Sequence, residues 1–133
     1  MLTSEQPVAL ITGSAKRLGR QMIQTLHSQG YRVIIHCNQS RADADELAQS
    51  LNLQRQHSAA VVQADLLNEA YWPELVQQVL ACFNRLDALV NNASSFYATP
   101  VAKASLDDWQ DLFGSNVKAP YFLSRALVPE LSQ

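Results

Sequence analysis

The sequence predicts an α/β fold in which helices cover both sides of a parallel sheet. Short, β-branched apolar runs alternate with stretches of helical periodicity along the 133 residues. The first apolar run ends at a turn with spaced glycines, Thr12 to Gly19, and this turn opens a helix. Strands that alternate with helices of this length pair in parallel through right-handed crossovers. We therefore expect a doubly wound sheet of about four strands in the order 3-2-1-4.

The first predicted unit is a strand, a turn and a helix. Residues 7–12 form a short apolar run, which is typical of a strand buried on both faces. Residues 18–29 repeat apolar side chains at helical spacing, and Leu18 and Ile23 belong to the same stripe. Gly30 follows and is expected to end the helix, because glycine adopts left-handed backbone without steric cost.

Two similar units follow along the chain. A β-branched strand at 31–36 precedes a helix at 41–53, whose first turn Ser40 can cap. A strand at 59–64 precedes an amphipathic helix at 71–83. This repetition supports the parallel sheet.

The last part of the sequence predicts one more strand and two helices. The strand is expected at 86–91. The first helix has one apolar stripe that includes Trp109 and Phe113. The second, at 116–131, is apolar and carries Pro120 near its start, where proline is tolerated.

Composition excludes several classes of protein. The net charge of −2 provides no field that would attract nucleic acid or an anionic membrane. No apolar run approaches the roughly 20 residues that cross a bilayer. The first residues lack the basic and apolar regions of a signal peptide, so we expect a cytoplasmic protein. Cys37 and Cys82 lack the spacing of a zinc site, which predicts reduced structural cysteines and no bound metal.

Small and polar residues gather where the four predicted strands end. In an open parallel sheet the ligand binds outside the carboxyl ends of the strands. Gly13 follows the first strand and Gly19 opens the first helix, so backbone N–H groups and the helix dipole converge on one point. That point favours a phosphate group. The sequence therefore predicts a dinucleotide site in a Rossmann-type domain.

The residues near the end of the second strand favour NADPH over NADH. An NAD site is expected to carry an acid there for the adenosine ribose. The sequence has His36-Cys37-Asn38-Gln39-Ser40-Arg41 instead, and Lys16-Arg17 lies in the adjoining turn. These donors and cations suit a ribose 2′-phosphate. The alternatives are an ordinary strand-end role for His36 and solvated surface positions for the three cations.

Residues after the third and fourth strands add to the predicted site. Asp65 either accepts a hydrogen bond from an adenine amino group or caps the turn before the next helix. Asn92-Ala93-Ser94 are small enough to let a cofactor approach closely. Phe96 lies in a loop, where its ring either stacks on a flat substrate or packs against the protein.

Four ordered elements resemble the short-chain dehydrogenase/reductase family: the Thr12 to Gly19 turn, Asp65, Asn91-Asn92-Ala93 and Asn116. Within the family, Arg17 in place of the middle glycine and the run from Ser94 to Tyr97 look like the pteridine reductases, although Gln39 stands where an arginine is common. The resemblance implies NADPH as cofactor and a pterin-like small molecule as substrate, with Arg17, Ser94 and Phe96 at the substrate. The residues expected to bind the cofactor are Gly13, Lys16, Arg17, Leu18, Gly19, His36, Cys37, Asn38, Gln39, Ser40, Asp65, Leu66, Asn92, Ala93, Ser94 and Asn116.

The catalytic residues of the family are not expected in this chain. Family members protonate their substrate through a Tyr-x-x-x-Lys pair, and none of Tyr31, Tyr71, Tyr97 and Tyr121 is followed by a lysine four residues later. We therefore expect residues 1–133 to be the N-terminal part of a single NADP-binding Rossmann domain whose C-terminal catalytic half is absent. Such a chain would be inactive alone, and its fourth strand would be a sheet edge.

Two other functions are compatible with the sequence. One is a short-chain reductase that acts on a 3-oxoacyl or other carbonyl substrate, and the other is a nucleotide-binding module without catalysis. The resemblance also implies a homo-oligomer in the full-length protein. The apolar helix at 116–131 either forms that interface or packs in the core.

Overall fold

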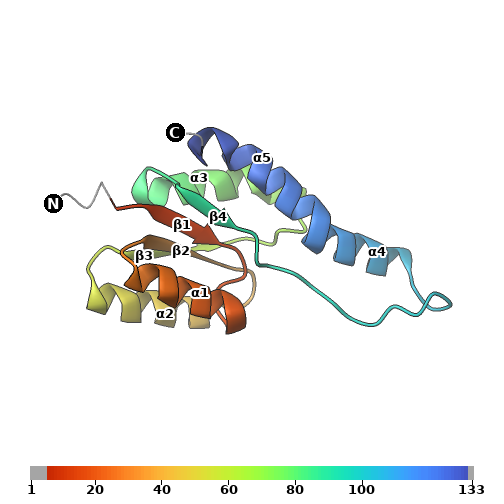
Figure 1. The fold of residues 1–133 in the computed structure, drawn as a ribbon. Helices are drawn as coiled ribbons and strands as arrows, with labels where there is room; N and C mark the ends of the chain where they lie inside the picture. Colours follow the sequence, from red (N-terminus) through yellow and green to blue (C-terminus); the bar gives the residue numbers. More distant parts are fainter. Residues whose placement is uncertain (1–5, 132–133) are drawn as a thin grey trace.

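In the computed structural model, which describes residues 6–131, four parallel strands form one open sheet in the order β3-β2-β1-β4 (Figure 1). The strands are β1 (Val8–Ile11), β2 (Arg32–Cys37), β3 (Ala59–Gln63) and β4 (Ala88–Val90). The longer helices are α1 (Arg17–Ser28), α2 (Arg41–Gln54), α3 (Trp72–Phe83), α4 (Leu106–Phe113) and α5 (Ala119–Leu131). A 3-10 helix, η2 (Glu69–Tyr71), precedes α3, and a π-helix, η3 (Gly114–Lys118), joins α4 to α5. The predicted fold class and strand order are confirmed.

The central position of β1 follows from its sequence, because all its residues are apolar and all are buried. Ala9 of β1 pairs with Val33 of β2 on one side and with Ala88 of β4 on the other. β2 is buried along its whole length, whereas β4 is half-buried and lies at the edge of the described sheet, as the sequence predicted. The carboxyl ends of these strands therefore lie next to one another.

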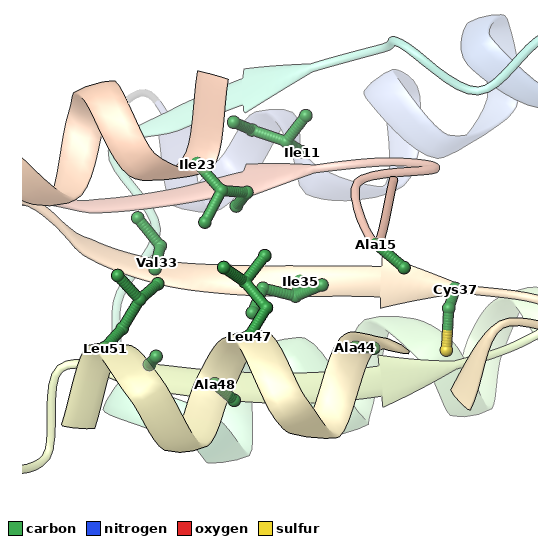
Figure 2. Close-up of a cluster of buried hydrophobic side chains, with 11 residues drawn as sticks. Ile11, Ala15, Ile23, Val33, Ile35, Cys37, Ala44, Leu47, Ala48 and Leu51 are labelled. Atoms are coloured by element: carbon green, nitrogen blue, oxygen red, sulfur yellow. The ribbon is translucent and has the colours of Figure 1, made fainter. Parts of the chain in front are cut away.

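Helices cover the two faces of the sheet in pairs, α1 with α2 and α3 with α5 (Figure 1). Side chains alternate along β2, so that Val33 and Ile35 join the core under α1 and α2 while Ile34 joins the opposite core. Figure 2 shows Leu47 and Leu51 of α2 directed toward β2. Burial of one such aliphatic side chain stabilises the fold by about 1.5–3 kcal/mol. Together the two cores hold the strand ends in fixed places.

Three details of the helix ends test the sequence analysis. Gly30 follows α1 with φ of 96°, as its predicted role requires. Leu18 does not belong to the buried stripe: 66% of it is exposed, because the first turn of α1 lies beyond the end of β1. Ser40 precedes α2, but its side chain makes no capping hydrogen bond, and only its carbonyl accepts from Ala44 N–H. The predicted Ser40 cap is therefore wrong.

The two helices predicted near the end of the chain form one continuous helical rod through η3. Ser105 begins it with a capping box, in which Ser105 and Asp108 each accept from the backbone N–H of the other. The inner side of α5 packs Leu123 and Leu127 into the core under α3. Six large apolar side chains on the rod are exposed: Val128 near its end, and five that we call the exposed rod residues, Leu106, Trp109, Phe113, Val117 and Tyr121. Helix 116–131 thus contributes to the core and also presents apolar surface.

Within the described residues, no helix has both the length and the apolar character needed to cross a membrane. In the same part of the chain, no cluster of His, Cys, Asp and Glu side chains is suited to hold a metal ion. Both cysteines are free; Cys37 is buried and Cys82 half-buried. The first five residues, which bear on the expected lack of a signal peptide, lie outside the described residues.

Candidate functional site

The glycine turn connects β1 to α1 and has two residues in left-handed backbone, Gly13 with φ of 59° and Arg17 with φ of 56°. A Cβ on Gly13 would lie 3.0 Å from Ala93 Cα, so this close approach also requires glycine. A Cβ on Gly19 would lie 2.6 Å from both Asn92 Nδ2 and the Gly13 carbonyl oxygen. Arg17, in contrast, carries a side chain in a backbone conformation that non-glycine residues rarely adopt.

Thr12 and Asn92 tie this turn to the end of β4. The Thr12 hydroxyl oxygen accepts from the backbone N–H groups of Asn92 at 3.0 Å and of Ala93 at 2.9 Å. The Asn92 side-chain amide donates to the carbonyl oxygens of Thr12 and Gly13, each at 3.1 Å. The Asn92 side chain therefore contacts the turn itself. It would affect a bound ligand by holding the turn in place.

The start of α1 is suited to an anion. The first backbone N–H groups of a helix, here those of Arg17, Leu18 and Gly19, have no partner within the helix. The helix dipole places partial positive charge at the same point, and the first turn of α1 holds no acid. Lys16 and Arg17 are exposed beside it. This donor set fits the pyrophosphate of a dinucleotide.

Two adjoining cavities lie at the strand ends, with volumes of about 260 Å³ and about 590 Å³. The smaller is lined by Gly13, His36, Asn38, Asp65, Leu66, Leu67, Ala93, Ser94, Ser95, Asp111 and Ser115. The larger is lined by Gly13, Ala15, Lys16, His36, Cys37, Asn38, Gln39, Ser40, Ser95 and Asp111. Most of the expected cofactor-binding residues therefore line one connected hollow. Those that do not line it are Arg17, Leu18, Gly19, Asn92 and Asn116.

His36 is buried, with 2% of its surface exposed, and both of its ring nitrogens contact backbone groups. Nδ1 lies 2.9 Å from the Gly13 nitrogen, and Nε2 lies 2.9 Å from the Ala64 carbonyl oxygen. Burial lowers the pKa of His36, and the smaller effect of the Ala64 carbonyl acts in the opposite direction. The ring is therefore neutral at pH 7, and both of its nitrogens are used in contacts within the protein. The position of His36 at a strand end did not indicate this structural role.

Lys16 of the glycine turn and Arg41 at the start of α2 each form an ion pair with an acid of α2. Lys16 Nζ lies 3.4 Å from Asp43 Oδ2, and Arg41 Nε lies 3.0 Å from Asp45 Oδ1. Both pairs are about half exposed, so each contributes little, on the order of 0–1 kcal/mol. A phosphate could replace the carboxylates at small cost. No acid lies between His36 and Arg41, so the residues present fit a 2′-phosphate.

Asp65 makes the turn contact that was one of its two predicted roles. Its Oδ1 accepts from the Leu67 backbone N–H at 3.0 Å. Asp65 also lines the smaller cavity, beside Leu66. The structure thus assigns Asp65 to the turn while keeping it at the site.

The loop after β4 lies over the cavities and is held there by the rod. Ser95 Oγ lies 2.6 Å from Ser115 Oγ, and the Asn116 side-chain amide donates to the Ser95 carbonyl oxygen at 2.8 Å. Tyr97 donates to Asp111 Oδ2 at 2.8 Å, and this bond raises the pKa of Tyr97 to about 12. Phe96, between these anchors, is 90% exposed. Its ring is therefore presented to solvent and is not packed in the core.

Several residues of the site were missed by sequence reasoning. Ser14, Asp111 and Ser115 bond the turn or the loop but did not stand out from the sequence, and Thr12 was noted only as the start of the glycine turn. Their contacts join segments far apart in the chain. Only Thr12 gave a signal, because it begins the glycine turn.

The parallel sheet, the glycine turn and the cavity at the strand ends are the features of a Rossmann-type α/β fold. The short chain dehydrogenase family profile matches residues 7–133, nearly the whole chain. The chain therefore belongs to the short-chain dehydrogenase family of oxidoreductases.

Individual relatives agree with this assignment. Pteridine reductase 1 from Leishmania tarentolae is 41% identical over an alignment that covers 95% of this chain and 54% of that protein. Granaticin polyketide synthase putative ketoacyl reductase 2 from Streptomyces violaceoruber is 35% identical, covering 97% and 51%. A 3-oxoacyl-[acyl-carrier-protein] reductase from Synechocystis is 29% identical, covering 90% and 48%. The chain spans about half the length of the curated relatives it matches.

Proposed function

We propose that this chain provides the NADPH site and part of the pterin site of an NADPH-dependent pteridine reductase. One observation carries the proposal: the hollow at the strand ends adjoins a cationic helix start and has no acid at the end of β2. The similarity to pteridine reductase 1 supports the choice of substrate class. On this proposal the chain is the N-terminal part of one NADP-binding domain and works in the cytoplasm.

The amide groups at the start of α1 would bind the cofactor pyrophosphate. Lys16, Arg17 and Ser40 would bind the 2′-phosphate and its neighbours, and Asp65 and Leu66 would border the adenine. When bound, NADPH would supply the hydride. The chain's own contribution is then to bind and orient the cofactor and to exclude water from it.

The substrate would lie beside the loop after β4. Phe96 is exposed, and its neighbours Ser95 and Tyr97 are both hydrogen-bonded to the rod. Its ring can therefore stack on a planar pterin. Ser94 and Arg17 would add a hydroxyl and a guanidinium for the donors and acceptors of that ring. The hydrogen bond to Asp111 raises the pKa of Tyr97, so this tyrosine is a poor proton donor. We therefore propose that residues outside this chain protonate the substrate.

The cofactor proposal is tested by titrating the purified protein with NADPH and with NADH while following nicotinamide fluorescence. We expect NADPH to bind more tightly than NADH, and the Lys16→Ala variant should reduce this difference in affinity. Equal affinities for the two cofactors would contradict the assigned 2′-phosphate site. Binding without turnover in the full reading frame would favour a nucleotide-binding module.

A second candidate function is the reduction of a 3-oxoacyl or related carbonyl, since two of the relatives are ketoacyl reductases by name. Biopterin or dihydrofolate and an acyl ketone should be compared as substrates of the full reading frame. Turnover of the acyl ketone alone would overturn the pterin proposal.

We also propose a homo-oligomer that buries the exposed rod residues. Trp109 and Phe113 stack on one another with their ring centroids 4.0 Å apart, yet 59% and 46% of these residues are exposed. Aromatic surface of this kind is enriched at interfaces. A second copy of the chain is the expected partner.

A further inference from the structure

We propose that His36 is a positioning residue: its neutral ring fixes Gly13 in the glycine turn, so that protonation of the ring weakens dinucleotide binding. The binding part of this inference rests on the proposed function of the turn. The positioning part concerns the protein alone and is tested without any cofactor.

The partners of His36 select one form of its ring. A backbone N–H can only donate, so Nδ1, which faces Gly13 N–H at 2.9 Å, carries no proton. A carbonyl oxygen can only accept, so Nε2, which faces the Ala64 carbonyl at 2.9 Å, carries the proton. The neutral ring thus joins the turn after β1 to the end of β3.

The backbone of His36 holds the next residue of the same turn. Ser14 N–H donates to the His36 carbonyl oxygen at 2.9 Å, and the His36 N–H donates to Ser14 Oγ at 3.3 Å. The Ser14 hydroxyl in turn donates to the Ile11 carbonyl oxygen at 2.7 Å. One residue of β2 therefore fixes two consecutive residues of the turn.

Gly13 is packed against the residues after β4 as well as against His36. Its φ is 59°, Ala93 lies against it, and its carbonyl accepts from the Asn92 side chain. The N–H groups that would bind the pyrophosphate begin three residues after Ser14, at Arg17. A displacement of Gly13 would therefore move these N–H groups away from the phosphate.

Protonation of His36 would place an N–H at Nδ1, opposite the N–H of Gly13. Two donors that face each other in a buried place repel, and neither finds an acceptor. The other charged side chains that line the same cavities are Lys16 of the turn, Asp65 after β3 and Asp111 of α4. The adjacent Cys37 thiol stays neutral, because burial raises its pKa. In the structure the two carboxylates already accept hydrogen bonds elsewhere, Asp65 from the Leu67 N–H and Asp111 from Tyr97, while the ring nitrogens of His36 contact Gly13 and Ala64.

The first experiment follows the Gly13 amide by ¹⁵N–¹H NMR between pH 7.5 and 5 in the cofactor-free protein. We expect its chemical shift to change together with the ring signals of His36, below the ordinary histidine pKa of about 6.5. In His36→Asn, the Asn carbonyl oxygen takes the place of Nδ1 as acceptor and does not titrate, so the Gly13 shift should become independent of pH. His27→Asn is the matched control, because His27 is equally buried but bonds Ser58, away from the turn.

The second experiment measures the dissociation constants of NADP+ and NAD+ by calorimetry over the same pH range. NAD+ lacks the 2′-phosphate, which itself titrates near pH 6, so it isolates the effect of His36. We expect wild-type and His27→Asn affinities to fall at acid pH, and the His36→Asn affinity to stay within about twofold of its value at pH 7.5. His36→Gln, whose amide favours the Ala64 side, should bind about tenfold more weakly at pH 7.5.

A Gly13 amide that ignores the His36 titration would overturn the inference. So would a His36→Gln protein that binds both dinucleotides as the wild type does, even with lower thermal stability, since that is the result of a merely structural role. If the wild type binds neither dinucleotide, the proposed function and the coupling to binding both fail. A Gly13 signal that follows His36 would then still support the positioning role, so the two failures are distinguishable.

Discussion

Arg17 offers a direct test of whether a strained residue serves the ligand. Its φ of 56° lies in the left-handed region, at a turn position between two glycines. Left-handed backbone costs a residue with a side chain about 1–2 kcal/mol. Glycine avoids that cost but loses more chain entropy on folding, by about 0.5–1 kcal/mol. The Arg17→Gly variant should therefore be as stable as the wild type or more stable, by about 0.5 kcal/mol on balance.

The same variant should bind NADPH poorly. A hydrogen bond to a charged group contributes about 1.5–3 kcal/mol, so loss of the guanidinium should weaken binding at least about tenfold. Arg17→Ala separates the two effects, because it removes the charge and keeps a side chain in left-handed backbone. We expect Arg17→Ala to bind as weakly as Arg17→Gly but without the gain in stability.

Urea denaturation of the three proteins measures the free energies of unfolding, and fluorescence titration measures NADPH affinity. Arg20→Ala, one turn further along α1, is the control for a general loss of positive charge. The reasoning is refuted if Arg17→Gly is clearly less stable than the wild type, since the backbone would then not be strained. It is also refuted if Arg17→Gly binds NADPH with unchanged affinity.

Three other predictions follow from the packing, the buried histidines and the exposed rod residues. Gly19→Ala places a methyl group 2.6 Å from backbone and Asn92 atoms, so it should lower the free energy of unfolding by about 3 kcal/mol. Gly30→Ala places its methyl group where nothing lies within 4 Å, so it should lower the free energy of unfolding by only about 1 kcal/mol, because of the left-handed backbone. If urea denaturation shows equal losses of stability for Gly19→Ala and Gly30→Ala, the packing argument is contradicted. Burial lowers the pKa of both His27 and His36, so the unfolded chain binds protons before the folded protein does as the pH falls. The contribution of these histidines to stability is therefore complete above the unfolded pKa of about 6.5. It is lost as the pH falls from there through the lower pKa values of the folded protein. Urea midpoints between pH 7.5 and 5 should show this loss, and His27→Asn should reduce its slope; an unchanged slope would exclude His27 as a cause. Trp109→Glu should shift the protein to a smaller species in analytical ultracentrifugation, whereas the same change at exposed Leu53 should not.

The sheet could be predicted because its signals are local. Each strand is a short apolar run, and Gly13 and Gly30 mark where a strand or helix ends. The order of the strands followed from the doubly wound arrangement that the glycine turn after the first strand indicates. The glycine turn and the strand-end residues likewise predicted a ligand-binding site, because a ligand in such a sheet binds outside the carboxyl ends of the strands.

What the sequence could not provide were contacts between distant residues. The bonds of His36 to Gly13 and Ala64 span 23 and 28 residues, and those of Asn92 to the turn span 79 and 80. No periodicity reports such pairs. The continuous helix through Gly114 was also unexpected, because a π-turn absorbs an extra residue that breaks the 3.6-residue pattern on which the prediction depends.

The strand order has a consequence for how the chain folds. β1 pairs with β2 in a register that joins Val8 to Arg32, whereas its pairing with β4 joins Ala9 to Ala88. Closing the longer loop costs about 1 kcal/mol more in chain entropy. β1, β2 and β3 with α1 and α2 should therefore form first, and β4 should join late. Hydrogen exchange should then find the slowest amides in β1 and β2, and β4 should open in a separate, less costly step together with the loop over the cavities.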